Sequence, residues 1–155
     1  RYFFSKEGKI LFTAKKKANE IYIGQGNDIH IKNNEECGRI MQCNGYNIAD
    51  VDGQEIKITY IPFGVRKQYS IETSFAHEGK TLFWSPREID VNLYGEHNHA
   101  PIPSKKNMLL KNQNGSPTFI VRKMENDVFE CECVSTVNSL IAFSIALSQI
   151  VGPFN

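Results

Sequence analysis

Residues 138–151 form an uncharged, largely apolar run near the end of the chain. Nine of its fourteen side chains are alanine, aliphatic or aromatic, and the others are asparagine, serine and glutamine. At 3.6 residues per turn this pattern leaves no wide polar face, so it predicts a helix that is buried on all sides. Ser135, Thr136 or Asn138 can cap its start, and Gly152-Pro153 ends it. Its length of about 21 Å falls short of the roughly 30 Å of a membrane span, which favours a core helix.

The preceding residues form short segments in many of which apolar and polar positions alternate. In residues 55–61, Ile56, Ile58 and Tyr60 share one face and Lys57 and Thr59 the other. Turn-forming pairs supply the positive φ angles that tight hairpins need, at Gly26-Asn27, Asn44-Gly45, Asp52-Gly53, Glu78-Gly79 and Asn114-Gly115. Strands are predicted at residues 10–14, 21–24, 29–32, 38–43, 47–51, 55–61, 67–73, 81–84, 91–94, 108–112, 118–123 and 128–134.

These two patterns together predict the fold class. An antiparallel sheet with one apolar face hides that face against a second sheet or by closing into a barrel. Because the C-terminal helix needs apolar surroundings on every side, we expect a mainly β protein with a closed antiparallel barrel around the helix. At 155 residues, the chain is expected to form one domain over residues 1–155.

Composition reduces the number of function classes that fit the chain. A net charge of +1 argues against a nucleic-acid-binding protein, which usually carries a strong basic excess. Four cysteines without a C-x-x-C spacing favour reduced thiols in an intracellular protein, although the start at Arg1 leaves a targeting segment open. Motifs for nucleophilic catalysis or phosphate loops are missing, so we expect a non-enzymatic protein without a cofactor. His97 and His99 lack further ligands nearby, and no metal site is expected.

Several short motifs resemble the C-terminal domain of tubby-like proteins. Residues 127–129 (DVF) and the helix after them are similar to the acidic-Val-Phe strand and QAFAIALS helix that end this domain. Further matches follow the order of the family at residues 11–17 (LFTAKKK), 38–40 (GRI), 64–67 (GVRK) and 104–107 (SKKN). The resemblance implies a twelve-stranded barrel around a central helix, an architecture shared with phospholipid scramblases and LURP-one-related proteins.

The resemblance also implies a binding site. Tubby-like domains bind phosphoinositides, especially phosphatidylinositol 4,5-bisphosphate, through basic residues on adjacent strands, because Lys and Arg form charge-assisted bonds with phosphate. The family positions fall on Arg39 and Arg66, with an asparagine at or near Asn19. Further basic residues that can contribute are Lys15, Lys16, Lys17 and Lys67.

One position departs from this pattern and leaves the function open. Met41 stands where the family has a second basic residue, on the same strand face as Arg39. The main expectation is an adaptor that tethers to phosphoinositide membranes in the cytoplasm, at the inner face of the plasma membrane or in a cilium or flagellum. One alternative is a docking module that binds protein partners in a trafficking or structural assembly and has lost lipid binding. Another is a scramblase-like lipid protein, which the short helix disfavours.

Overall fold

A computed structural model describes residues 1–27, 31, 35–63, 68–73, 81–83, 102–112 and 114–153 of the protein. One helix, α1, covers Ser139–Val151. Eleven strands precede it within these residues: β1 (Tyr2–Lys6), β2 (Lys9–Lys17), β3 (Glu20–Gln25), β4 (Gly38–Gln42), β5 (Tyr46–Val51), β6 (Gln54–Phe63), β7 (Gln68–Thr73), β8 (Thr81–Phe83), β9 (Met108–Lys111), β10 (Pro117–Glu125) and β11 (Val128–Cys133).

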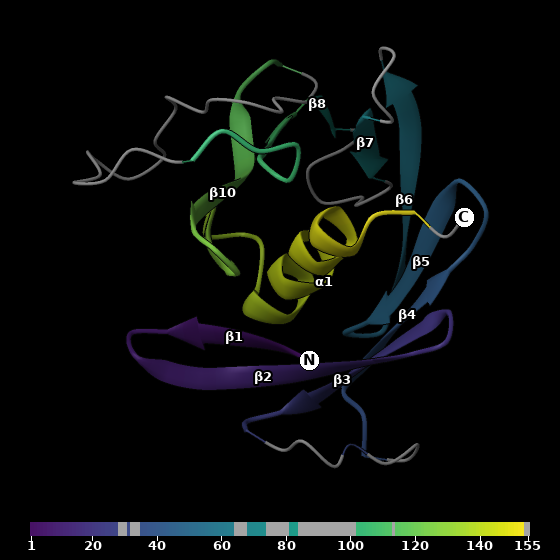
Figure 1. The fold of residues 1–155 in the computed structure, drawn as a ribbon, viewed down its shortest axis with the longest axis vertical. Helices are drawn as coiled ribbons and strands as arrows, with labels where there is room; N and C mark the ends of the chain where they lie inside the picture. The colour runs from purple at the N-terminus through teal and green to yellow at the C-terminus, as the bar shows by residue number, and fades with distance from the viewer. Residues whose placement is uncertain are drawn as a thin grey trace.

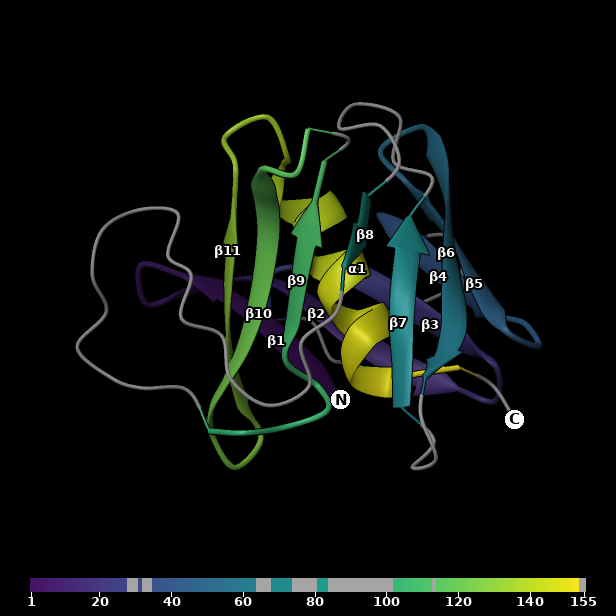
Figure 2. The same cartoon turned by 90° about the horizontal axis from the view of Figure 1, so that it is seen from above.

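The strands form two antiparallel sheets that curve around α1. One sheet has the order β1-β2-β3-β4-β5-β6-β7-β8, so each strand pairs with its neighbour in sequence, and the other has the order β11-β10-β9. β8 lies beside β9, but the two strands belong to separate sheets. Figure 1 shows α1 enclosed by β1 and β2 on one side, β10 on another and β4 to β6 on a third. Seen from above in Figure 2, the helix lies behind β9 and β7.

This arrangement confirms the mainly β class and the central C-terminal helix. Ten of the twelve predicted strands are found with shifted ends, while those at 29–32 and 91–94 lie largely or wholly outside the described residues. β1 was not predicted, because Tyr2, Phe3 and Phe4 are consecutive aromatic residues without alternation. The described residues show two sheets, and they do not show a single closed barrel of twelve strands.

The hairpin between β5 and β6 illustrates how the sequence sets the pairing. Asp52 and Gly53 have φ angles of 53° and 70°, both in the left-handed region. A two-residue hairpin turn needs this conformation to match the right-handed twist of the strands it joins. This turn pairs Val51 with Gln54 and Ala49 with Ile56. As a result, the buried residues Ala49 and Val51 of β5 and Ile56 and Ile58 of β6 lie on the same face of the sheet.

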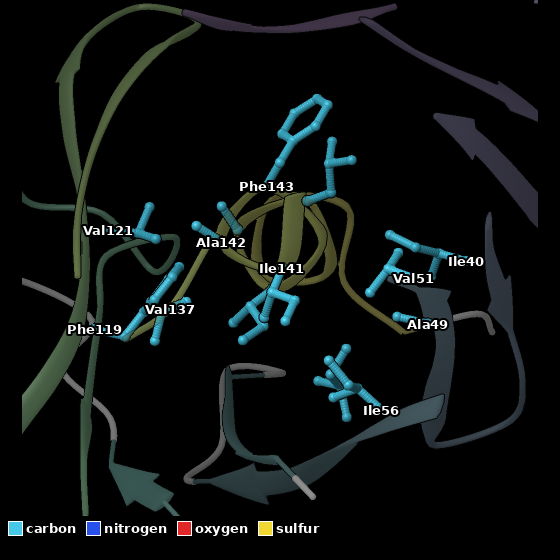
Figure 3. Close-up of a cluster of buried hydrophobic side chains, with 14 of the residues drawn as sticks. Ile40, Ala49, Val51, Ile56, Phe119, Val121, Val137, Ile141, Ala142 and Phe143 are labelled. Carbon is cyan, nitrogen blue, oxygen red and sulfur yellow. The ribbon is translucent and has the colours of Figure 1, made fainter. Parts of the chain in front are cut away.

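That inner face packs against the helix. Ile21, Ile40, Ala49 and Ile56 face one another across β3 to β6, and each is at most 1% exposed. Figure 3 shows residues of this sheet on one side of α1 and Phe119, Val121 and Val137 on another, around Ile141, Ala142 and Phe143. The helix therefore links the cores of the two sheets.

Polar contacts hold both ends of the helix against β4 to β6. At the start, Asn138 Oδ1 accepts a hydrogen bond from Ile141 N at 2.9 Å, and its Nδ2 donates to Asp52 Oδ2 at 2.6 Å. At the end, the Tyr60 hydroxyl donates to Ser148 O at 2.5 Å, and Gln42 Nε2 donates to Gly152 O at 3.1 Å. The Asn138 bond caps the free N–H of Ile141, and the Tyr60 hydroxyl adds a second donor to Ser148 O, which also accepts from Gly152 N.

The helix is 13 residues long, and no helix among the described residues is long and apolar enough to cross a membrane. The four cysteines are free thiols. Phe129, Cys131 and Cys133 are partly buried against the core, so this face of β11 packs inward.

Leu147→Ala tests the stabilising role of the helix. Leu147 is 1% exposed, and its truncation leaves a cavity, so we expect the free energy of unfolding to fall by about 2–5 kcal/mol. Urea unfolding measures the change. Met41→Ala on the exposed surface is the control and should change stability by no more than about 0.5 kcal/mol. Equal effects of the two substitutions would contradict a helix-centred core.

Because the Tyr60 hydroxyl is buried, we expect the protein to lose stability at high pH. Burial raises the pKa of the Tyr60 hydroxyl above its ordinary value of 10.0, although its bonds to Ser148 and Asn47 lower it in part. The folded state therefore keeps this proton more tightly than the unfolded chain, and stability should decrease as the pH rises above about 10. In urea unfolding across a pH series, Tyr60→Phe should show a shallower decrease. An unchanged slope would contradict the burial of a neutral Tyr60 hydroxyl.

Candidate binding surface on the outer wall

The outward face of β2 to β6, here called the outer wall, carries two rows of facing side chains. Strand pairing aligns residues from neighbouring strands, and because side chains alternate, every second residue points outward. The first row contains Lys15, Tyr22, Arg39, Asp50 and Glu55, and the second contains Lys17, Glu20, Met41, Ile48 and Lys57.

Arg39 lies at the centre of a compact group, here called the Arg39 cluster, with Glu36, Glu20 and Tyr22. Its Nη2 donates to Glu36 Oε1 at 2.5 Å, and its Nη1 lies 3.8 Å from Glu20 Oε1. The guanidinium carbon lies 4.9 Å from the centre of the Tyr22 ring, within the range of a cation–π contact. Two carboxylates and an aromatic face therefore already surround this cation.

Hydrogen bonds within the cluster change its acid–base properties. The Tyr22 hydroxyl donates to Glu20 Oε2, and this bond to a carboxylate raises the pKa of Tyr22, while Arg39 lowers it in part. The hydrogen bond to Glu36 raises the pKa of Arg39, so the guanidinium stays charged. In both cases the largest cause is a hydrogen bond to a carboxylate, that of Glu20 for Tyr22 and that of Glu36 for Arg39.

A groove beside the Arg39 cluster has a volume of about 540 Å³. Its lining includes four carboxylates, from Glu36, Asp50, Asp52 and Glu55, against the single guanidinium of Arg39. Met41, which is 43% exposed, and the half-buried Ile48 add apolar surface. We call it the acidic groove, because its surroundings favour a positively charged ligand over an anion.

The structure brings together only some of the predicted lipid-binding residues. Lys15 and Lys17 are exposed on the outer wall beside Tyr22 and Glu20. Lys16 is paired with Ile21, whose side chain points to the core, so it belongs to the opposite face.

Asn19 is exposed and links the turn after β2 to β4, since its Nδ2 donates to Gln42 O at 3.4 Å and its own carbonyl accepts from Gln42 N. Arg66 and Lys67 lie outside the described residues, as do His97 and His99. Where the structure is described, it holds no group of three or more His, Cys, Asp or Glu side chains arranged for a metal ion.

Sequence reasoning found Arg39 and missed its partners. Alternation along β3 could have placed Glu20 and Tyr22 on one face, but only the register between β3 and β4 sets Tyr22 opposite Arg39. Glu36 lies just before β4, where no periodic pattern indicates the direction of its side chain.

Comparisons with known proteins add no family: no protein-family model, curated protein or solved structure matches the chain. The tubby-like resemblance therefore stays a prediction from short motifs.

Glu20→Gln tests the Arg39 cluster in solution. Removing the carboxylate that accepts the Tyr22 hydroxyl bond should lower the pKa of Tyr22, because the tyrosinate then meets less negative charge. A tyrosinate absorbance titration of the variant, compared with the unsubstituted protein, measures the difference. Glu55→Gln, on the same wall but beside Asp50, is the matched control and should leave the curve unchanged. Identical curves for all three proteins would contradict the Tyr22–Glu20 contact.

Proposed function

We propose that the chain is a non-enzymatic docking domain whose two sheets form a tubby-like barrel, and that its outer wall binds a positively charged segment of a partner protein. The observation that carries this proposal is the acidic groove beside an already paired Arg39. The partner belongs to a trafficking or structural assembly in this proposal, as the docking alternative from the sequence implies.

The surroundings of Arg39 support a protein partner over an anionic headgroup. A phosphate approaching Arg39 competes with Glu36 and also meets the carboxylates of Asp50 on the next strand and Glu55 on the strand after it. A lysine or arginine of a partner meets the opposite field. Met41, Ile48 and Tyr22 supply apolar and aromatic contact surface beside these charges, and such residues are typical of protein interfaces.

Lipid binding is a second candidate function, carried by a different observation. Lys15 and Lys17 lie exposed at one end of the β2–β3 hairpin, and neither forms an ion pair with a described residue. Two lysines near an anionic leaflet contribute roughly 2 kcal/mol, which supports weak, reversible attachment. In this case the hairpin, rather than Arg39, contacts the headgroups.

A basic probe peptide tests the docking proposal. A fluorescent peptide of alternating arginine and leucine should bind the chain, and its affinity should fall as salt screens the carboxylates. Asp50→Asn and Glu55→Gln should each weaken binding about two- to fivefold, as the loss of one exposed ion pair predicts. Glu125→Gln, an exposed carboxylate outside the groove, is the control. Anisotropy titrations with equal affinities for all variants would exclude the acidic groove as the docking site.

Liposome flotation separates the two functions. Under the docking proposal, vesicles with phosphatidylinositol 4,5-bisphosphate should carry no more protein than vesicles of phosphatidylcholine alone. Enrichment that Arg39→Ala abolishes would contradict the proposal and favour the headgroup site that the resemblance implies. If Lys15→Ala and Lys17→Ala abolish the enrichment and Arg39→Ala leaves it unchanged, the result would instead support attachment through the hairpin.

A further inference from the structure

The two sheets leave an open seam between β1 and β11. β1 pairs with β2 and β11 pairs with β10, and in the described part of the chain neither strand has a partner on its other edge. Figure 2 shows β11 and β1 running at a slant to each other on one flank of the molecule. Among the described strands, the outer edges of β1 and β11 therefore present main-chain N–H and C=O groups without a strand to pair with.

A groove of about 740 Å³ lies in this seam, and we call it the seam groove. The helix contributes Phe143, Leu147 and Ile150 to its lining, and the strands contribute Tyr2, Phe4 and Phe129. Phe4 and Phe143 are in contact, with ring centres 5.2 Å apart. The volume lies within the range of roughly 300–1,000 Å³ that is typical of ligand sites. Most of the lining residues are apolar or aromatic, and Arg1, Asp127 and Glu130 add charged groups.

Exposed apolar side chains mark both edges of the groove. Phe3 on β1 is 51% exposed, and Val128 at the start of β11 is 48% exposed. Both also line the groove. Charged residues often protect an edge strand from pairing; in β1 the only one is Lys6, its last residue, and Arg1 precedes the strand.

We propose that the seam groove binds an extended segment of a partner protein, which adds to the free edge of β1 as a strand and inserts alternate apolar side chains toward α1. Main-chain groups at an edge are satisfied by another main chain, whereas an acyl chain fills the groove and leaves these groups unpaired. β1 has five residues, or about 17 Å at 3.4 Å each, which sets the length of the bound segment at about five residues. This site is separate from the outer wall, so either proposal can fail without the other.

Selected peptides provide the probe. Linear heptapeptides displayed on phage are selected against the immobilised chain, and the strongest binder is synthesised for titration. The expected binder carries apolar residues at alternate positions. In nuclear magnetic resonance spectra it should shift the amides of β1 and slow their exchange with water. Binders without alternation, or shifts confined to β4 and β5, would overturn the proposal.

Two matched comparisons separate strand addition from other occupants. N-methylation of the peptide at alternate residues removes donors on one of its edges, so one of the two N-methylated registers should bind about tenfold more weakly and the other unchanged. Phe3→Glu places a charge on the β1 edge and should weaken binding at least about tenfold, while Met41→Glu on the outer wall, the control, should not. Circular dichroism verifies that both variants fold.

Three other results would overturn the proposal. Equal affinity of both N-methylated registers shows that the main chain takes no part. If the selection yields no peptide and oleate binds at this site, the groove is a site for acyl chains. If the selection yields no peptide and the chain forms a dimer that Phe3→Glu dissociates, a second copy of the chain covers the seam.

Discussion

The fold depends on one constraint, which is that an uncharged helix without a polar face must be kept away from water. Ile141, Ala142, Phe143, Ile145 and Leu147 are each at most 4% exposed. Burying a large apolar side chain contributes about 1.5–3 kcal/mol, so the helix and the inner faces of the sheets stabilise each other. The two ends of the helix carry polar contacts: Asn138 caps the N–H of Ile141, and the Tyr60 hydroxyl donates to Ser148 O.

Because the inner face is apolar, strand alternation places most of the charges of β2 to β6 on the outer wall. Their mutual arrangement then decides what the wall can bind. Arg39 is flanked by Glu36 and Glu20 and faces Asp50, so its charge is largely balanced within the protein. Lys15 and Lys17 stand at the edge of this acidic surface rather than beside a second arginine. A surface on which cations and carboxylates lie side by side is more complementary to a protein surface with its own charge pattern than to a polyphosphate headgroup.

Much of the fold could be predicted from local patterns. The helix follows from composition and the Gly152-Pro153 end, and the structure selects Asn138 among the three candidate caps. The hairpin at Asp52-Gly53 follows from its turn residues. β1 could not be predicted in this way, because consecutive aromatic residues do not distinguish a strand from other buried segments. Arg122 also departs from expectation: a charge in a strand usually faces water, yet it is 1% exposed and paired with Glu130 and Glu132 on β11.

The candidate site was harder to predict than the fold, because it depends on contacts across strands. The basic residues around Arg39 are visible in the sequence, but their neighbours are set by register. A single step along β2 moves Lys16 to the face opposite Lys15 and Lys17. Likewise, the seam exists because β1 and β11 end their respective sheets, which is a property of the topology rather than of either segment.

Native-state hydrogen exchange of the amides of α1 tests the central claim most directly. If the helix lies dry between the two sheets, the amides of Ala142 to Leu147 exchange only when the whole protein unfolds. Their free energies of exchange then equal the free energy of unfolding from urea titration. Exchange of these amides at a much lower free energy, independent of global unfolding, would show that the helix detaches from the sheets and would contradict the account.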